Sequence, residues 1–403
     1  MAASDIPATT SRSSVCRLLI FYGLLTAGCI GCFFAIRSVG EGLPRRENSS
    51  AAEAQNLSAA LSAAHALPQL LLALAAVILT GRLLATALAR VGQPPVIGEV
   101  LAGILLGPSL FSWFGYEASP LLPGDVAPYL SIIAQLGVIL YMFLVGLEFN
   151  PGQLRSQAHA AVAISHASIM VPFLLGGLLA LGLFGELAPA GVPFTSFALF
   201  MGVAMAVTAF PVLARILTDR GMATSALGVL ALSCAAVDDV TAWCLLAFVS
   251  GVVKSQASSA IYVVILSLLY IGGMLLLVRP LAVRLIGRTD GKGLGPTAIA
   301  FVFAALLLSA LATESIGIHA VFGAFLLGVV IPHDSHIAQS LKAGLEQVVT
   351  VLLLPAFFAY TGMRTQIGLV SGWEQWLICG LIIVVASVGK FGGTLVAARL
   401  AGL

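Results

Sequence analysis

The sequence predicts an α-helical protein that crosses a membrane many times, and two observations support this prediction. Of its 403 residues, 60% are hydrophobic and only 9% are charged. A soluble domain carries roughly 25% charged residues, so a water-exposed surface cannot be built from this chain. Long apolar stretches also recur from residue 18 to the last residue, and each is near the roughly 20 residues that a helix needs to cross the bilayer core.

Apolar length and turn residues place the membrane spans from residue 66 onward. Residues 1–65 form an N-terminal extension, whose apolar run at 18–36 is expected to be a signal anchor, a transmembrane helix or a signal sequence. The 42 glycines of the chain favour close packing between helices. The expected spans are 66–89, 95–111, 127–147, 157–184, 194–218, 223–252, 258–286, 295–313, 316–332, 341–363 and 373–400.

Positive charges gather at alternate ends of these spans. The loops at the other ends, past residue 66, hold only Lys254 and Arg364. Because cytoplasmic loops carry an excess of lysine and arginine, the first set of ends is expected in the cytoplasm, together with the chain end at Leu403. That first set holds Arg90, Arg155, Arg220, Arg284, Arg288, Lys292, Lys342 and Arg399.

Charge and cysteine patterns exclude several classes of protein. The formal net charge is +2, and the chain has no basic run of the kind that binds nucleic acid. Its six cysteines are scattered through apolar segments, whereas a disulfide framework or a zinc site needs clustered, regularly spaced thiols. We therefore expect no nucleic-acid partner, no resident metal and no cofactor.

Two short patterns occur twice in the chain, in the same order. The segment at 93–107 is echoed at 318–328, and the segment at 143–148 is echoed at 358–363. An odd number of spans separates the starts of the two units, so the second unit is inverted relative to the first. Inverted repeats are typical of secondary transporters, whose substrate site lies near the middle of the membrane.

These echoes predict how the chain is divided. We expect a first repeat of six helices at 66–252, a linker helix at 253–294, and a second repeat at 295–403 with four helices only. An incomplete second repeat would make this chain a fragment or a shortened form of a longer protein.

Two adjacent aspartates, Asp238 and Asp239, lie near the middle of the expected span at 223–252. A charged residue at the bilayer centre costs about 2.5–3.5 kcal/mol on insertion scales, so such residues usually have a function. Two carboxylates at this depth can bind a cation or protons, and they would titrate as one coupled pair. We therefore predict that they form the cation and proton site.

Three further features of the sequence are expected to serve this pair. Pro211 should break its helix at membrane depth, which is tolerated where the backbone lines a cavity, and the residues of the break would help to coordinate the ion. Lys390 lies in the middle of the last span and is expected to pair with one of the aspartates. Glu99, near the inner end of its span, is a candidate for an access path. The expected break comprises Thr208, Ala209, Phe210 and Pro211.

The segments at 208–217 and 236–240 resemble the monovalent cation:proton antiporter-2 family, and the resemblance runs from about residue 66 to the end. It implies an inverted-repeat sodium/proton antiporter fold in a bacterial inner (plasma) membrane, with a core domain that moves against a dimerisation domain. It also implies that Asp239 binds the cation and that Asp238 pairs with Lys390. Members of the family have two further helices after the one that carries the lysine.

The resulting functional prediction is a transporter and not an enzyme: a homodimeric secondary antiporter that exchanges Na+ or K+ for protons by alternating access. A sodium-coupled symporter of organic solutes on a related fold, or a truncated fragment that does not transport, are the alternatives. An intramembrane aspartyl protease needs two carboxylates that face each other across a bond. Adjacent residues on one helix point about 100° apart, which disfavours that chemistry.

Overall fold

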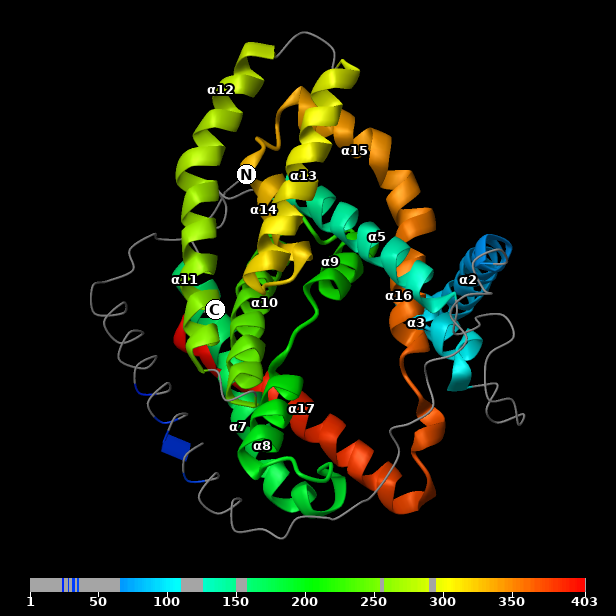
Figure 1. Ribbon diagram of the computed structural model, residues 1–403, viewed down its shortest axis with the longest axis vertical. Coiled ribbons are helices and arrows are strands. Elements are labelled where there is room, and N and C mark those ends of the chain that lie inside the picture. Colours follow the sequence, from blue (N-terminus) through cyan, green and yellow to red (C-terminus); the bar gives the residue numbers. More distant parts are fainter. Residues whose placement is uncertain are drawn as a thin grey trace, which may run out of the picture.

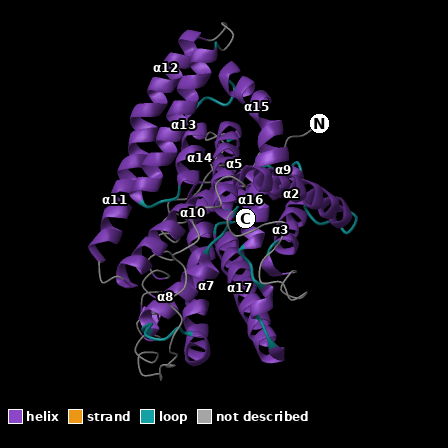
Figure 2. Ribbon diagram, turned by 45° about the vertical axis from the view of Figure 1, so that its right-hand side comes forward, coloured by secondary structure: helices purple, strands orange, loops and turns teal. Residues whose placement is uncertain are grey.

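The computed structural model describes residues 66–109, 126–149, 158–253, 257–289 and 295–402, with a few single residues before them. The expected run at 18–36 therefore falls almost wholly outside the described residues, as do Arg155, Lys254 and Lys292. Within the described ranges, every regular element is a helix (Figure 2). The α-helices are α2 (Ala66–Ala89), α3 (Pro95–Leu106), α5 (Ala127–Glu148), α7 (Ala158–Leu187), α8 (Phe194–Ala206), α9 (Phe210–Asp219), α10 (Ala226–Val253), α11 (Ala257–Gly273), α12 (Arg279–Thr289), α13 (Pro296–Ile316), α14 (Ala320–Val330), α15 (His336–Val348), α16 (Leu354–Met363) and α17 (Gly372–Leu400).

The helices are long and apolar enough for a polytopic membrane protein. In the described part of the chain, nine helical stretches could cross a bilayer by length and composition, and α3 and α14 are shorter apolar helices. Large apolar side chains cover the outside, such as Leu276 at 76% and Phe391 at 78% exposed, as expected where lipid is the solvent. The predicted all-α polytopic fold is confirmed.

One helix starts earlier than expected. The span predicted from residue 341 begins at His336, because the Ser335 hydroxyl accepts a hydrogen bond from the Ala338 backbone N–H and caps the helix. The first turn of α15 is polar, so apolar length alone does not reveal it.

The helices form two bundles. We call α2, α3, α5, α13, α14, α15 and α16 the first bundle, and α7, α8, α9, α10 and α17 the second bundle, from the contacts among them. In Figure 1, α2, α3 and α16 lie together on the right, and α7, α8 and α17 lie at the lower end. The α11 helix packs against both α10 and α13 and so connects the bundles. Direct contacts between them, which we call the seam, join α9 to α3 and α5, and α10 to α14.

Glycines bring the helices of the first bundle into backbone contact. A Cβ atom added to Gly146 of α5 would lie 2.3 Å from the carbonyl oxygen of Phe325, and one added to Gly328 of α14 would lie 2.4 Å from that of Phe143. The crossing of α3 and α16 repeats this reciprocal arrangement, with Gly103 against Ala359 and Gly362 against Val100. The two crossings contain the echoed segments, and each glycine follows the carbonyl of its own helix by three positions.

We expect Gly146→Ala to destabilise the protein, because the added methyl group cannot fit against the carbonyl of Phe325. Overpacking of this kind costs about 1–3 kcal/mol. The melting temperature of the purified protein in detergent should fall by at least about 2–4 °C. The control is Gly182→Ala in α7, where an added Cβ atom meets nothing within 4 Å. Equal melting temperatures for the two variants would contradict the close α5–α14 contact.

Candidate ion-binding site

The helix that precedes the aspartates is interrupted inside the bundle. α8 ends at Ala206, α9 begins at Phe210, and residues 207–209 between them are not helical. Pro211 lies in the first turn of α9, where its missing N–H removes no hydrogen bond. In a continuous helix its ring would clash with the carbonyl of Val207, four positions earlier, so the helix cannot run unbroken from α8 into α9. The broken helix expected from Pro211 is confirmed.

Charged side chains meet both ends of the break. The Nζ atom of Lys390, on α17, donates a hydrogen bond of 2.7 Å to the carbonyl oxygen of Ala206 at the end of α8. The backbone N–H of Phe210 at the start of α9 donates to the carboxylate of Asp239. A helix carries partial negative charge at its C-terminus and partial positive charge at its N-terminus, so each side chain faces an end of opposite sign.

Asp238 is surrounded by hydroxyl groups. Ser165 donates to its Oδ1 atom at 2.5 Å, while Ser168 and Thr208 donate to its Oδ2 atom at 3.0 and 2.9 Å. Both serines lie on α7, one helical turn apart. Asp238 is 3% exposed, and the three hydrogen bonds satisfy a carboxylate that would be costly to bury alone.

Lys390 reaches Asp238 through Thr208. Its ammonium group donates to the Thr208 hydroxyl, which in turn donates to Asp238. Thr208 thus connects the lysine of α17 to the aspartate of α10.

Asp239 lies on the other side of the break from Lys390. It is 9% exposed, and it faces the first turn of α9. The ring of Phe210 is buried and packs edge-on against Phe325 of the first bundle, with ring centroids 4.9 Å apart. The residue that donates to Asp239 therefore also touches the first bundle.

The expected residues of the break do not all take part. Thr208 and Phe210 contact the aspartates through a hydroxyl and a backbone amide. The carbonyl of Ala209 accepts from the Leu213 backbone N–H at the start of α9, and Pro211 lies in the first turn of that helix. Ser165 and Ser168 were not expected from the sequence, since serines are common in apolar helices. Their only signal is a spacing of three, which puts both on one helix face.

Two cavities lie near the aspartates. One, of about 500 Å³, borders Asp238, Thr208 and Lys390, and the rest of its lining is mostly aliphatic. The other, of about 230 Å³, lies between the bundles and is lined from α5, α9 and α10. Leu232, which lines the smaller cavity, precedes Asp239 by two turns of α10.

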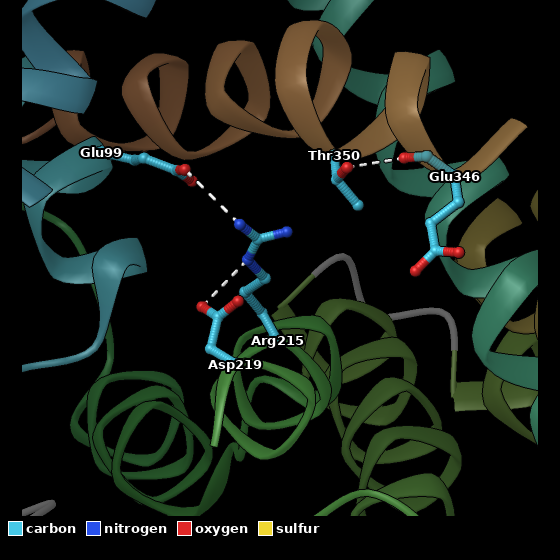
Figure 3. A network of polar contacts seen from close by, with 5 residues as sticks. All are labelled: Glu99, Arg215, Asp219, Glu346 and Thr350. Atoms are coloured by element: carbon cyan, nitrogen blue, oxygen red, sulfur yellow. Dashed lines mark hydrogen bonds and ion pairs between the residues drawn. The ribbon is translucent and has the colours of Figure 1, made fainter. Parts of the chain in front are cut away.

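Glu99 lies away from the aspartates, at the seam. It is 2% exposed, and its Oε1 atom is 3.8 Å from the Nη2 atom of Arg215, on α9. Arg215 also bonds through its Nε atom to Asp219, one turn further along α9, at 3.1 Å. Figure 3 shows the arginine extended between the two carboxylates. The pairing of Glu99 with Arg215 was not expected from the sequence.

Comparisons with known proteins show the family to which the chain belongs. A family model described as "Sodium/hydrogen exchanger, transmembrane" matches residues 56–403. The Na(+)/H(+) antiporter NhaS4 of Synechocystis is 40% identical over 330 residues, which cover 80% of each chain. Cation/H(+) antiporter 17 of Arabidopsis thaliana is 37% identical over 335 residues, but these cover 82% of this chain and only 40% of that protein.

Two matches of lower sequence identity are also cation antiporters with protons. K(+)/H(+) antiporter 1 of Saccharomyces cerevisiae is 30% identical over 326 residues, which cover 77% of this chain and 37% of that protein. The solved structure of the sodium proton antiporter MjNhaP1 of Methanocaldococcus jannaschii superposes with a TM-score of 0.58 at 15% identity, covering 81% of this chain and 79% of that one. The last likeness supports the fold. The chain is an integral, multi-pass membrane protein that belongs to the sodium/hydrogen exchanger family, a family of transporters and not of enzymes.

Proposed function

We propose that this chain exchanges a monovalent cation, Na+ or K+, for protons, and that Asp239 and Asp238 form the site that the two ions occupy in turn. The observation that carries the proposal is a buried pair of carboxylates at a helix break inside the membrane. The matched relatives named above are sodium, potassium or cation antiporters with protons, and no matched relative named here is a symporter of organic solutes.

The two aspartates are suited to different tasks. Asp238 accepts three hydroxyl hydrogen bonds and is tied to Lys390 through Thr208, so its position is fixed. Asp239 accepts a hydrogen bond from the backbone N–H of Phe210, whose ring packs against Phe325 of the first bundle. We assign Asp239 as the carboxylate that binds the cation or a proton, and Asp238 with Lys390 as the pair that holds the break in place.

The two-bundle architecture supports alternating access. The site belongs to the second bundle, whereas the smaller cavity lies between the bundles, on the side of the seam that holds Glu148 and His333. A displacement of the second bundle relative to the first would carry Asp239, two turns of α10 beyond Leu232, with it and would change its access to that cavity. The same side carries Arg90 and Arg220, so we place it in the cytoplasm, together with the chain end at Leu403. A homodimer in a bacterial plasma membrane completes the proposal.

We expect Asp239→Asn to abolish exchange, because a neutral amide can neither balance a cation nor take up a proton. The measurement is the internal pH of proteoliposomes, followed with a dye while Na+, K+ or Li+ is added in turn. The matched control is Asp334→Asn, since the side chain of Asp334 is 86% exposed in a loop and its loss should leave exchange intact. Normal exchange by a well-folded Asp239→Asn protein would refute the assignment.

We expect Thr208→Val to impair exchange far more than Thr208→Ser, which keeps the hydroxyl between Lys390 and Asp238. A buried polar group left unsatisfied costs about 1–3 kcal/mol, which corresponds to roughly a 5- to 150-fold loss. The rate of exchange as a function of cation concentration would show the loss in the valine variant alone. Identical kinetics for the two variants would show that the hydroxyl link is dispensable.

A further inference from the structure

A second group of buried charges lies at the seam, apart from the proposed ion site. It consists of Glu99 on α3, in the first bundle, and of Arg215 and Asp219 on α9, in the second bundle. Glu99 is 2% exposed and Arg215 is 6% exposed. A buried ion pair between two helices that belong to different bundles resists any relative displacement of the bundles.

The two contacts of Arg215 differ in strength. Its bond to Asp219 is a direct hydrogen bond of 3.1 Å within one helix, while its distance to Glu99 is 3.8 Å across the seam. The Oε2 atom of Glu99 is buried and has no hydrogen-bond partner within the described residues. If the second bundle moves, Arg215 therefore keeps Asp219 as its partner, but Glu99 loses its closest countercharge.

Apart from Arg215, the described residues place one other cation near Glu99, and its electrostatic effect on Glu99 is smaller than that of Arg215. On α2, Arg82 is close enough to interact electrostatically with both Glu99 and Asp219. On α16, Tyr360 packs in the apolar cluster around Leu106 and Met363, at the opposite end of α3. On α5, the hydroxyl of Tyr141 is buried near Arg215 and Asp219. In Figure 3, Glu346 lies on the far side of Arg215 from Glu99.

We propose that Glu99 is a second proton-binding carboxylate of the transporter, distinct from Asp238 and Asp239. In its charged form it holds Arg215 and keeps the bundles in the arrangement seen here. When it binds a proton, the seam between α3 and α9 can open. The reason is that a carboxylate without a countercharge is far more costly to bury than a neutral carboxyl group. Asp219, with 16% of its side chain exposed, connects the pair to the aqueous edge of the bundle.

Proton binding at Glu99 would make the opening of the seam depend on pH. Acid neutralises Glu99 and releases Arg215, while alkali restores the charge and closes the seam. If one proton is bound per opening, the opening equilibrium changes by about tenfold for each pH unit over the range in which Glu99 titrates. This inference rests on the proposed exchange of cations for protons, because relative motion of the bundles is part of that cycle.

The test is hydrogen–deuterium exchange of the backbone amides in α3 and α9, measured on the whole purified protein in detergent between about pH 4 and about pH 9, a range that includes the ordinary pKa of a glutamate. Rates are corrected for the intrinsic effect of pH on amide exchange. In the native protein we expect the corrected exchange rates of these amides, which report the opening of the seam, to increase toward acid pH. In Glu99→Gln, which resembles the protonated form, opening at alkaline pH should equal that of the native protein at acid pH.

Two further variants sharpen the test. Asp219→Asn leaves Arg215 with Glu99 as its remaining carboxylate partner, so the seam should need a more acid pH to open, a change of opposite sign. Glu346→Gln is the matched control, because Glu346 is exposed and its substitution should leave the pH profile unchanged. Should Glu99→Gln fail to fold, Glu99→Gln combined with Arg215→Gln removes both charges and should show the same loss of pH dependence.

The outcomes separate this proposal from the exchange function. An opening that does not depend on pH in the native protein, or that keeps its pH dependence in both glutamine variants, overturns the role of Glu99 even where proteoliposomes exchange cations for protons. A pH-dependent opening that is lost in the Glu99 variants supports the role of Glu99, and it does so even if no cation moves protons across the vesicle membrane.

Discussion

A helix that stops in the middle of a bilayer leaves backbone carbonyls and amides without partners, and lipid supplies none. This constraint organises the centre of the molecule. Lys390 donates a hydrogen bond to the carbonyl of Ala206 at the end of α8, and Asp239 accepts one from the backbone N–H of Phe210 at the start of α9. Each charge is stabilised by the helix end that it faces, so neither the break nor the charges would be tolerated at this depth alone. Asp238 and Thr208 then connect the two sides of the break.

Different interactions hold together the helices within each bundle. In the first bundle, glycines allow backbones to touch, and dispersion between closely packed surfaces stabilises the crossings. In the second bundle, hydroxyl, carboxylate and ammonium groups bind one another across α7, α10 and α17. Glycine crossings occur in the second bundle too, where Gly393 of α17 approaches Ala167 of α7. Its centre is nevertheless polar, and it depends on the protonation and occupancy of Asp238 and Asp239, whereas the glycine crossings of the first bundle carry no charge.

Much of this arrangement can be predicted from the sequence, because charged residues and helix breakers are rare in membrane-spanning helices and are easily recognised there. Asp238, Asp239 and Lys390 stand out as charges in apolar runs, and Pro211 stands out as a helix breaker between them. The hydroxyls of Ser165 and Ser168 do not stand out, since a serine in an apolar helix usually bonds to its own backbone. The pairing of Glu99 with Arg215 depends on how α3 crosses α9, and nothing local to either residue encodes that crossing. Likewise, Thr208 was expected at the break, but its place between lysine and aspartate requires the position of α17.

The reciprocal glycine crossings of the first bundle also constrain the order in which the protein is made. Each crossing joins a helix from early in the chain to one from late in it: α5 to α14, and α3 to α16. During synthesis, the crossing of α5 can therefore form only after the chain has emerged as far as Val330, and the crossing of α3 only after it has emerged as far as Met363. In the second bundle, α7, α8, α9 and α10 follow one another directly and can associate as they are inserted, but the packing of α7 against α17 must wait until α17 (Gly372–Leu400) has emerged. In the interval, the small-residue faces of α3 and α5 stay open to lipid, where another small-residue face could pack against them.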